Sequence, residues 1–312
     1  MFYVINDLHG AKKLIEKAVE GIKHLDLGDV LIINGDGAGA RGPIMNNLVK
    51  IFYEVRRGET EERKLLEAIE KIIDEEPVIP KEWIYDAVHA GLFRKLMADK
   101  YEKFARCLRK ELYEVLEETL EPLSDAARER GVQILYLPGN GEITPEDFST
   151  EDYTTEIAVP PEKRFYQCIA KDGYFERFGI EYVPYATKLS NGSALISTNM
   201  LDLDERQAVE TLCRQGLLDG TLKEVIVHYP PAIAPIGGAF SFWVPNKMDI
   251  KRSDALKNIL DILPLEEAAQ IYFGHIHLGA NDQRMDLYPS SMSFIVTGYQ
   301  CTWVKPGTVL KI

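Results

Sequence analysis

The sequence lacks any long apolar run. Its apolar stretches, such as residues 30–33, have the length of a strand and fall far short of the roughly 20 residues that a membrane-spanning helix needs. The opening residues, MFYVINDLHG, contain neither the basic start nor the extended apolar segment of a secretory signal. Low-complexity segments are also missing, and 46% of the residues are hydrophobic, which argues against a disordered or fibrous protein. We therefore expect a cytoplasmic globular protein with no membrane partner.

Paired cysteines and an excess of basic charge are missing as well. The four cysteines stand far apart and form no Cys-x-x-Cys pair, which indicates free thiols in a reducing compartment. The 49 acidic residues outnumber the 36 lysines and arginines and give a net charge of −13. We therefore expect no broad nucleic-acid-binding surface. A phosphate-bearing substrate remains compatible with this charge, because bound metal ions can supply positive charge locally.

Strands and helices alternate in the first part of the sequence. Residues 2–6 and 29–34 have the pattern of buried strands, residues 11–22 form a helical pattern between them, and residues 133–137 resemble a third buried strand. This alternation predicts an α/β fold with a parallel, helix-covered sheet. Shorter strand patterns follow at residues 181–183, 193–197, 224–227, 271–273, 294–297 and 308–312. Two further helices are predicted at residues 204–217 and 253–263.

A long helical segment separates the second and third predicted strands. Residues 44–130 contain few helix breakers, and between residues 93 and 115 apolar side chains recur every three or four positions. We interpret this stripe as a surface that faces a core. The predicted organisation is a catalytic core of residues 1–43 and 131–312, interrupted by a helical insertion of residues 44–130. We expect the insertion to act as a cap that shapes access to the core.

Residues with metal-binding side chains follow the ends of several predicted strands. These residues are Asp7, His9, Asp36, Asn140, His228, His275 and His277. Active sites of open α/β sheets are built at this carboxyl edge. The mixture of nitrogen and oxygen donors suits Mn, Fe, Zn or Co. Seven ligands exceed the need of one ion and fit two divalent metal ions that share a bridging carboxylate.

The ordered set of motifs resembles the calcineurin-like metallophosphoesterase family. The matching pieces are Asp7-Leu8-His9, Gly35-Asp36, Gly139-Asn140, His228 in VHYPP and Gly274-His275-Ile276-His277. The resemblance spans nearly the whole chain except the helical insertion. It implies a four-layer α/β/β/α arrangement, in which two sheets pack face to face between helices.

The resemblance also implies a role for each ligand. The ligands implied for one metal are Asp7, His9 and His277. Those implied for the other are Asn140, His228 and His275. Asp36 is implied as the bridge, and together with Asn140 it is the expected catalytic residue. The implied reaction is the hydrolysis of a small-molecule phosphate ester by a hydroxide that bridges the two metals.

Two departures from the family pattern bear on the substrate. The family usually has histidine after Gly-Asn, whereas this sequence has Gly141 followed by Glu142. Residues 35–42 also depart from the Gly-Asp-x-x-Asp-Arg-Gly pattern of phosphoprotein phosphatases, because the second aspartate is missing and Arg41 stands one place late. Arg41 is a candidate phosphate contact, with an ordinary surface arginine as the equal alternative.

These departures rank the substrate classes. They favour a phosphodiester or nucleotide-type substrate, with a phosphomonoesterase or protein phosphatase as the first alternative. The second alternative is a catalytically degenerate scaffold that retains the fold and binds a partner through the helical insertion. No pattern in the sequence indicates an oligomeric state.

Overall fold

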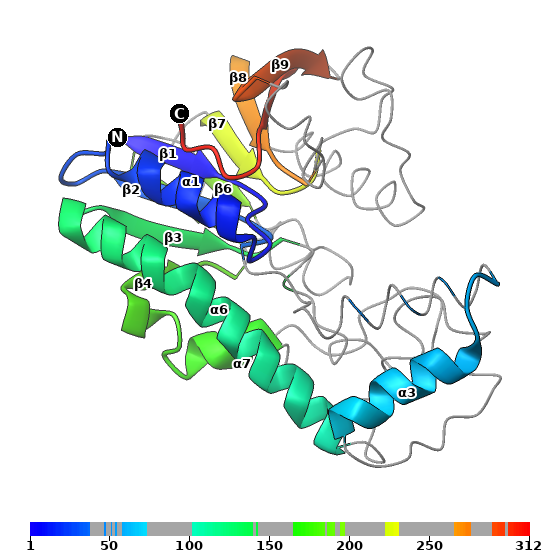
Figure 1. Ribbon diagram of the computed structural model, residues 1–312. Helices are drawn as coiled ribbons and strands as arrows, with labels where there is room; N and C mark the ends of the chain where they lie inside the picture. The colour runs from blue at the N-terminus through cyan, green and yellow to red at the C-terminus, as the bar shows by residue number, and fades with distance from the viewer. Residues whose placement is uncertain are drawn as a thin grey trace.

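Two mostly parallel β-sheets form the framework of the protein, and helices cover one of them (Figure 1). The computed structural model describes residues 1–37, 47, 51, 54, 58–73, 102–139, 142, 165–184, 186–190, 194–196, 222–230, 265–275, 289–296 and 299–312. The expected α/β fold class is confirmed at this level. The helices predicted at residues 204–217 and 253–263 lie outside the described residues.

The first sheet has five strands. In spatial order they are β11 (Leu310–Lys311), β1 (Phe2–Ile5), β2 (Val30–Asn34), β3 (Gln133–Leu137) and β4 (Ile180–Tyr182). The strands from β1 to β4 run parallel, and β11 pairs antiparallel with β1 at the edge. Because parallel neighbours are in register, their carboxyl ends lie along one edge of the sheet.

The second sheet has six strands. In spatial order they are β5 (Ala186–Lys188), β6 (Ala194–Ile196), β7 (Leu222–Val227), β8 (Leu265–Phe273), β10 (Tyr299–Val304) and β9 (Ser291–Val296). The strands β6, β7, β8 and β10 run parallel, whereas β5 and β9 are antiparallel to their neighbours. The strands β5 and β10 have no counterpart in the sequence-based prediction. The predicted strand at residues 294–297 overlaps β9, and no predicted strand covers residues 299–304.

Several helices lie on one face of the first sheet. They are α1 (Lys12–Ile22), α6 (Glu102–Arg130), α7 (Phe165–Lys171) and a short 3-10 helix, η4 (Glu176–Phe178). The helix α3 (Glu62–Ile73) contacts α6 and lies away from the sheets (Figure 1). The helix α1 buries a stripe that includes Leu14, Ala18 and Ile22, the spacing of one helix face. Every helix in the described part of the chain is too short or too polar to cross a membrane.

The first sheet is buried on both faces, and this explains its continuous apolar strands. Ile5 and Ile33 belong to a core shared with α1, α6 and α7. Their neighbours Val4 and Ile32 belong to a second core, because successive side chains of a strand point to opposite faces. The second core also contains Ile226, Tyr272 and Val304 from the second sheet. The two sheets therefore pack face to face.

The long helix α6 connects the predicted insertion to the core. Its residues Leu112, Leu116, Leu120 and Leu123 are buried in the core between the helices and the first sheet. The start of α6 extends away from the sheets toward α3 (Figure 1). The later turns of α6 thus act as the crossover that makes β2 and β3 parallel. The division of the chain at residues 43 and 131 remains a prediction.

Two buried asparagines join the sheets at the carboxyl ends of their strands. Asn6 follows β1 and donates through Nδ2 to the carbonyl oxygens of Phe273, at 3.2 Å, and of Val304, at 3.4 Å. Asn34 ends β2 and donates to the carbonyl oxygen of Val227 at 2.6 Å. The three acceptors are the last residues of β8, β10 and β7. These hydrogen bonds therefore fix the separation of the two sheets at this edge.

We expect Asn34→Ala to lower the free energy of unfolding by about 1–3 kcal/mol, because it removes a buried hydrogen bond between the sheets. Gln133→Ala is the matched control. The Gln133 amide bonds Glu181 at an exposed site, 3.1 Å away, at the opposite end of the first sheet, so its loss should cost less than about 0.5 kcal/mol. Urea unfolding measures both values. Equal losses for the two variants would contradict the special role of the inter-sheet hydrogen bond.

Candidate metal centre

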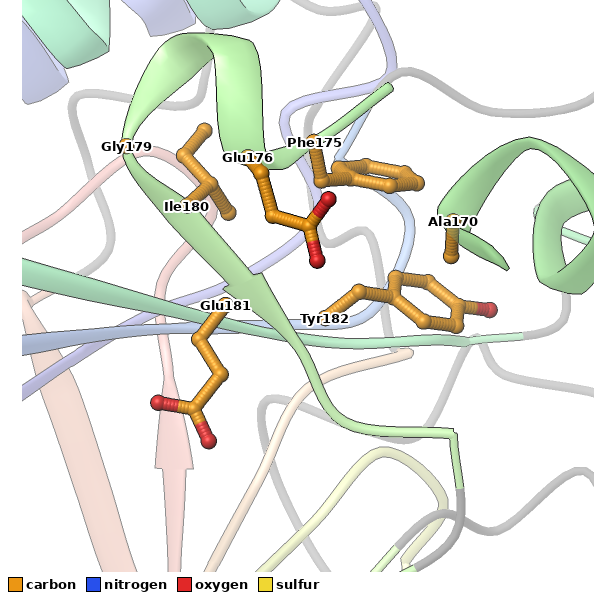
Figure 2. Close-up of a pocket in the computed structure, with 7 residues that line it drawn as sticks. All are labelled: Ala170, Phe175, Glu176, Gly179, Ile180, Glu181 and Tyr182. Carbon is orange, nitrogen blue, oxygen red and sulfur yellow. The ribbon is translucent and has the colours of Figure 1, made fainter. Parts of the chain in front are cut away.

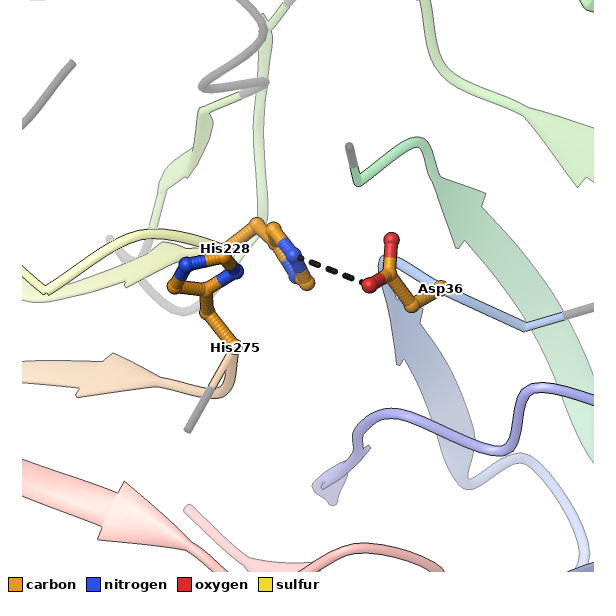
Figure 3. A group of neighbouring side chains, drawn as sticks. All are labelled: Asp36, His228 and His275. Carbon is orange, nitrogen blue, oxygen red and sulfur yellow. Dashed lines mark ion pairs between the residues drawn. The ribbon is translucent and has the colours of Figure 1, made fainter. Parts of the chain in front are cut away.

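Five of the seven predicted ligands meet where the two sheets join. Asp7 and His9 follow β1, Asp36 follows β2, His228 follows β7 and His275 follows β8. Their ligand atoms form two groups, and within each group all the atoms lie within 4.8 Å of one another. The first group is Asp7, His9 and Asp36, and the second is Asp36, His228 and His275. Figure 3 shows the second group, with the two imidazoles on one side of the Asp36 carboxylate.

Asp36 belongs to both groups. Its Oδ2 atom lies 3.5 Å from Nε2 of His9 and also 3.5 Å from Nε2 of His228. Two atoms bound to one ion at about 2.1 Å are roughly 3–4 Å apart, so both spacings suit metal ligation. Asn140, His277 and Arg41 lie outside the described residues, and their predicted roles remain predictions.

The electrostatics of this site favour a cation. Asp7 and Asp36 are fully buried, and Glu142 is 3% exposed. Burial lowers the pKa of His228, but the carboxylates of Asp36, Asp7 and Glu142 outweigh burial and raise this pKa to about 9. Burial, together with the Asp36 charge, raises the pKa of Glu142 to about 7. Buried carboxylates are costly unless a positive charge compensates them, and divalent cations supply that charge.

Backbone contacts orient two of the ligands. The Nδ1 atom of His228 lies 3.2 Å from the carbonyl oxygen of Asn34. A carbonyl oxygen only accepts, so Nδ1 donates to it, and Nε2 is the nitrogen that would bind a metal in place of a proton. The backbone N–H of His275 donates to both carboxylate oxygens of Asp7, at 3.1 and 3.0 Å. The Tyr229 ring lies 4.1 Å from that of His275 and restricts its rotation.

The backbone at the site is strained. Four ligands have a positive φ: Asp7 (54°), His9 (49°), Asp36 (48°) and His275 (64°). Within the described ranges, they are the only residues other than glycine with this conformation. Such positions cost about 1–3 kcal/mol each and cluster at functional sites. The strain therefore marks the same edge of the sheets that the ligand pattern marks.

Two glycines allow the loops to approach the carboxylates. A Cβ atom at Gly139 would lie 2.5 Å from Oδ1 of Asp36, and one at Gly274 would lie 2.5 Å from Oδ2 of Asp7. Each carboxylate is thus covered by a glycine that directly precedes a predicted ligand. The His9 side chain is 34% exposed, whereas that of His228 is fully buried. Among the described ligands, His9 and His275 are partly exposed, whereas Asp7, Asp36 and His228 are buried.

A separate pocket of about 330 Å³ lies beside β4. The rings of Phe175 and Tyr182 stack at 4.7 Å along it, and Glu181 points away from them (Figure 2). The lining contains none of the predicted ligands. The chemistry that the sequence predicts therefore lies at the junction of the sheets, and not in this pocket.

Three supporting residues were missed by the sequence-based prediction: Asn6, Asn34 and Glu142. Both asparagines had a detectable signal. The pair Ile-Asn stands directly before Asp7 and again directly before Gly35-Asp36. Glu142 was named only as the residue after Gly141, and no role was predicted for it. Its contacts join residues more than 100 positions apart, and no local pattern predicts them.

The sequence matches no protein-family model, and a search among curated proteins finds no significant match. The resemblance to the calcineurin-like metallophosphoesterases therefore rests on the motifs and stays a prediction.

The shared position of Asp36 predicts how substitutions change the metal content. Asp36→Ala should lower the occupancy of both metals, because each loses a charged ligand, whereas His9→Ala should mainly weaken one. His24→Ala is the control, since His24 is a 76% exposed side chain just beyond the end of α1. Elemental analysis after dialysis against Mn²⁺ gives the metal-to-protein ratio. Two metals retained by Asp36→Ala would disprove the bridging role.

Proposed function

We propose that this protein is a dinuclear-metal phosphoesterase of the metallophosphoesterase type, acting on a phosphodiester or nucleotide-type substrate. The observation that carries the proposal is the membership of Asp36 in two adjacent groups of ligand atoms. A carboxylate has two oxygens and can bind two cations at once. Buried carboxylates, oriented imidazoles and strained ligand loops in one place support the same reading.

The residues at the site fit a pair of divalent ions such as Mn, Fe, Zn or Co. Asp7 and His9 would hold one ion with Asp36, and His228 and His275 would hold the other with Asp36. By resemblance, His277 adds to the first set and Asn140 to the second. Two bound cations would polarise a phosphoryl oxygen and increase the acidity of bound water.

The chain itself contributes orientation and exclusion of water. The Asn34 carbonyl holds the His228 ring in the tautomer that presents Nε2. The amide of His275 fixes both oxygens of Asp7. Because Asp7, Asp36 and His228 are fully buried, few waters compete for their donor atoms. A substrate would approach on the side of the partly exposed His9.

The arrangement of layers supports the proposal as well. Helices, the first sheet and the second sheet follow one another in three layers. The proposed four-layer fold adds a helical layer on the outer face of the second sheet. The proposed fold and the proposed activity rest on the same motifs.

The residues after Asn140 bear on the substrate. A histidine in place of Gly141 would assist the leaving group, a contribution of about 10²–10⁴-fold in general acid catalysis. Glu142 does not replace it, because its carboxylate faces the amides of Asp36, Gly37 and Gly139. Without that assistance, esters whose leaving groups are stable anions react most readily.

We expect the Mn²⁺-loaded protein to hydrolyse an aryl phosphodiester with a higher kcat/KM than a phosphoserine peptide. Gly141→His should raise turnover of alkyl phosphomonoesters more than that of the aryl diester, because only the poor leaving group needs the added acid. Steady-state kinetics on bis(4-nitrophenyl) phosphate, an alkyl phosphomonoester and a phosphoserine peptide give these values.

Asp36→Ala is the control for metal-dependent turnover, and thermal unfolding of Gly141→His checks that the loop tolerates a side chain. Faster turnover of the phosphoserine peptide by the wild-type protein would contradict the substrate preference. Protein that carries two metals and hydrolyses no nucleotide, diester or phosphopeptide would favour the partner-binding scaffold instead.

A further inference from the structure

The carboxylate of Glu142 is surrounded by hydrogen-bond donors. Its Oε2 atom accepts from the backbone N–H groups of Asp36, at 2.9 Å, and Gly139, at 2.6 Å. Its Oε1 atom accepts from the N–H of Gly37 at 3.0 Å and from the hydroxyl of Tyr136 at 2.5 Å. The side chain is only 3% exposed, so water contributes little to its solvation.

The three backbone donors come from two separate loops. Asp36 and Gly37 belong to the loop after β2, whereas Gly139 belongs to the loop after β3. These loops carry the bridging carboxylate of Asp36 and the predicted ligand Asn140. The adjacent strands β2 and β3 pair as far as Asn34 and Leu137. Beyond this point, hydrogen bonds to the Glu142 carboxylate connect the two loops. A single carboxylate thus holds both loops together where the strand hydrogen bonds end.

Glu142 also accepts a hydrogen bond from Gly139, which lies close to it in the sequence. Gly139 is three residues before it, and the Gly139 N–H bonds the same oxygen as the Asp36 N–H. The position of Asp36 is therefore linked to the positions of Gly139 and Glu142. The close approach of Gly139 to Oδ1 of Asp36 shows how tightly the two loops are joined.

We propose that Glu142 is a positioning residue that holds the Asp36 loop and the residue 139–142 loop in the arrangement required for metal binding. The proposal rests on the proposed function in that it assumes a metal at Asp36. Glu142 stands two residues after the predicted ligand Asn140, so its contacts act next to both loops that carry predicted ligands.

Glu142→Gln is the most direct test. Glutamine has the same shape, but its amide nitrogen donates instead of accepting, so at least one of the three backbone N–H groups loses its acceptor. Changes of this kind in residues that orient metal ligands typically weaken metal binding by about 10–100-fold. We expect this loss for Co²⁺, together with a changed visible absorption spectrum of the bound ion.

Asp29→Asn is the matched control. Asp29 is also a buried carboxylate, 4% exposed, and accepts from the backbone N–H of Asp26 at 2.8 Å. It precedes β2, whereas Asp36 follows this strand of five residues, so roughly 17 Å of strand separate it from the site. Asp29→Asn should lower the stability of the protein and leave its affinity for Co²⁺ and the absorption spectrum of the bound ion unchanged.

Co²⁺ titration followed by absorption, and urea unfolding of the metal-free proteins, are measured for the wild type and both variants. Weaker Co²⁺ binding with an altered spectrum in Glu142→Gln alone supports the positioning role. Wild-type affinity and spectrum in Glu142→Gln, or equal losses in both variants, would overturn it. If Glu142→Gln does not fold, hydrogen exchange of the wild-type segments around residues 36–37 and 139 decides. Rapid exchange there in the metal-free protein overturns the proposal, and slow exchange supports it.

The outcomes also separate this proposal from the proposed function. Wild-type protein that binds Co²⁺ but hydrolyses no phosphate ester refutes the enzyme and leaves the role of Glu142 standing. Wild-type protein that hydrolyses esters while Glu142→Gln keeps the wild-type spectrum refutes only the role of Glu142. Wild-type protein that binds no Co²⁺ refutes both.

Discussion

The hydrogen bonds from Asn6 and Asn34 to the ends of the second sheet are the constraint on which the site depends. Asp7, His9 and Asp36 are carried by the first sheet, and His228 and His275 by the second. The distances between these two sets are therefore set by the separation of the sheets. Each asparagine stands one or two positions before a ligand and bonds the carbonyl of a residue at a strand end. These hydrogen bonds thus act one or two residues away from the predicted ligands Asp7 and Asp36.

The site contains several features that oppose folding. Two fully buried aspartates, a buried glutamate and four ligands at positive φ each cost free energy. The compensation comes from the two hydrophobic cores on either face of the first sheet, which contain fully buried residues such as Leu116 and Ile226. A cation at Asp36 would offset part of the electrostatic cost, so metal binding and folding are expected to be coupled.

Two carboxylates at the site, those of Asp36 and Glu142, have different surroundings. Asp36 faces the imidazoles of His9 and His228, whereas Glu142 faces the amides of Asp36, Gly37 and Gly139. An imidazole nitrogen with a free lone pair can bind a metal ion, whereas a backbone N–H group can only donate a hydrogen bond. The first environment suits an ion and the second suits a permanent structural contact. Chemically similar side chains therefore have separate roles at one site.

The sequence by itself determined the local structure that supports the site. The buried strands before Asp7, Asp36 and His228 follow from continuous apolar runs, and the place of each ligand just beyond a strand end is a matter of chain order. Only the tertiary structure decided that Asp36 belongs to both ligand groups, that Asn6 and Asn34 bridge the sheets, and that Glu142 joins two loops. The hydrogen bonds of Asn6 and Asn34, and those of Glu142 with Asp36 and Gly37, connect residues separated by 105 to 298 positions. No local periodicity encodes such pairings, because they arise from the packing of one sheet on another.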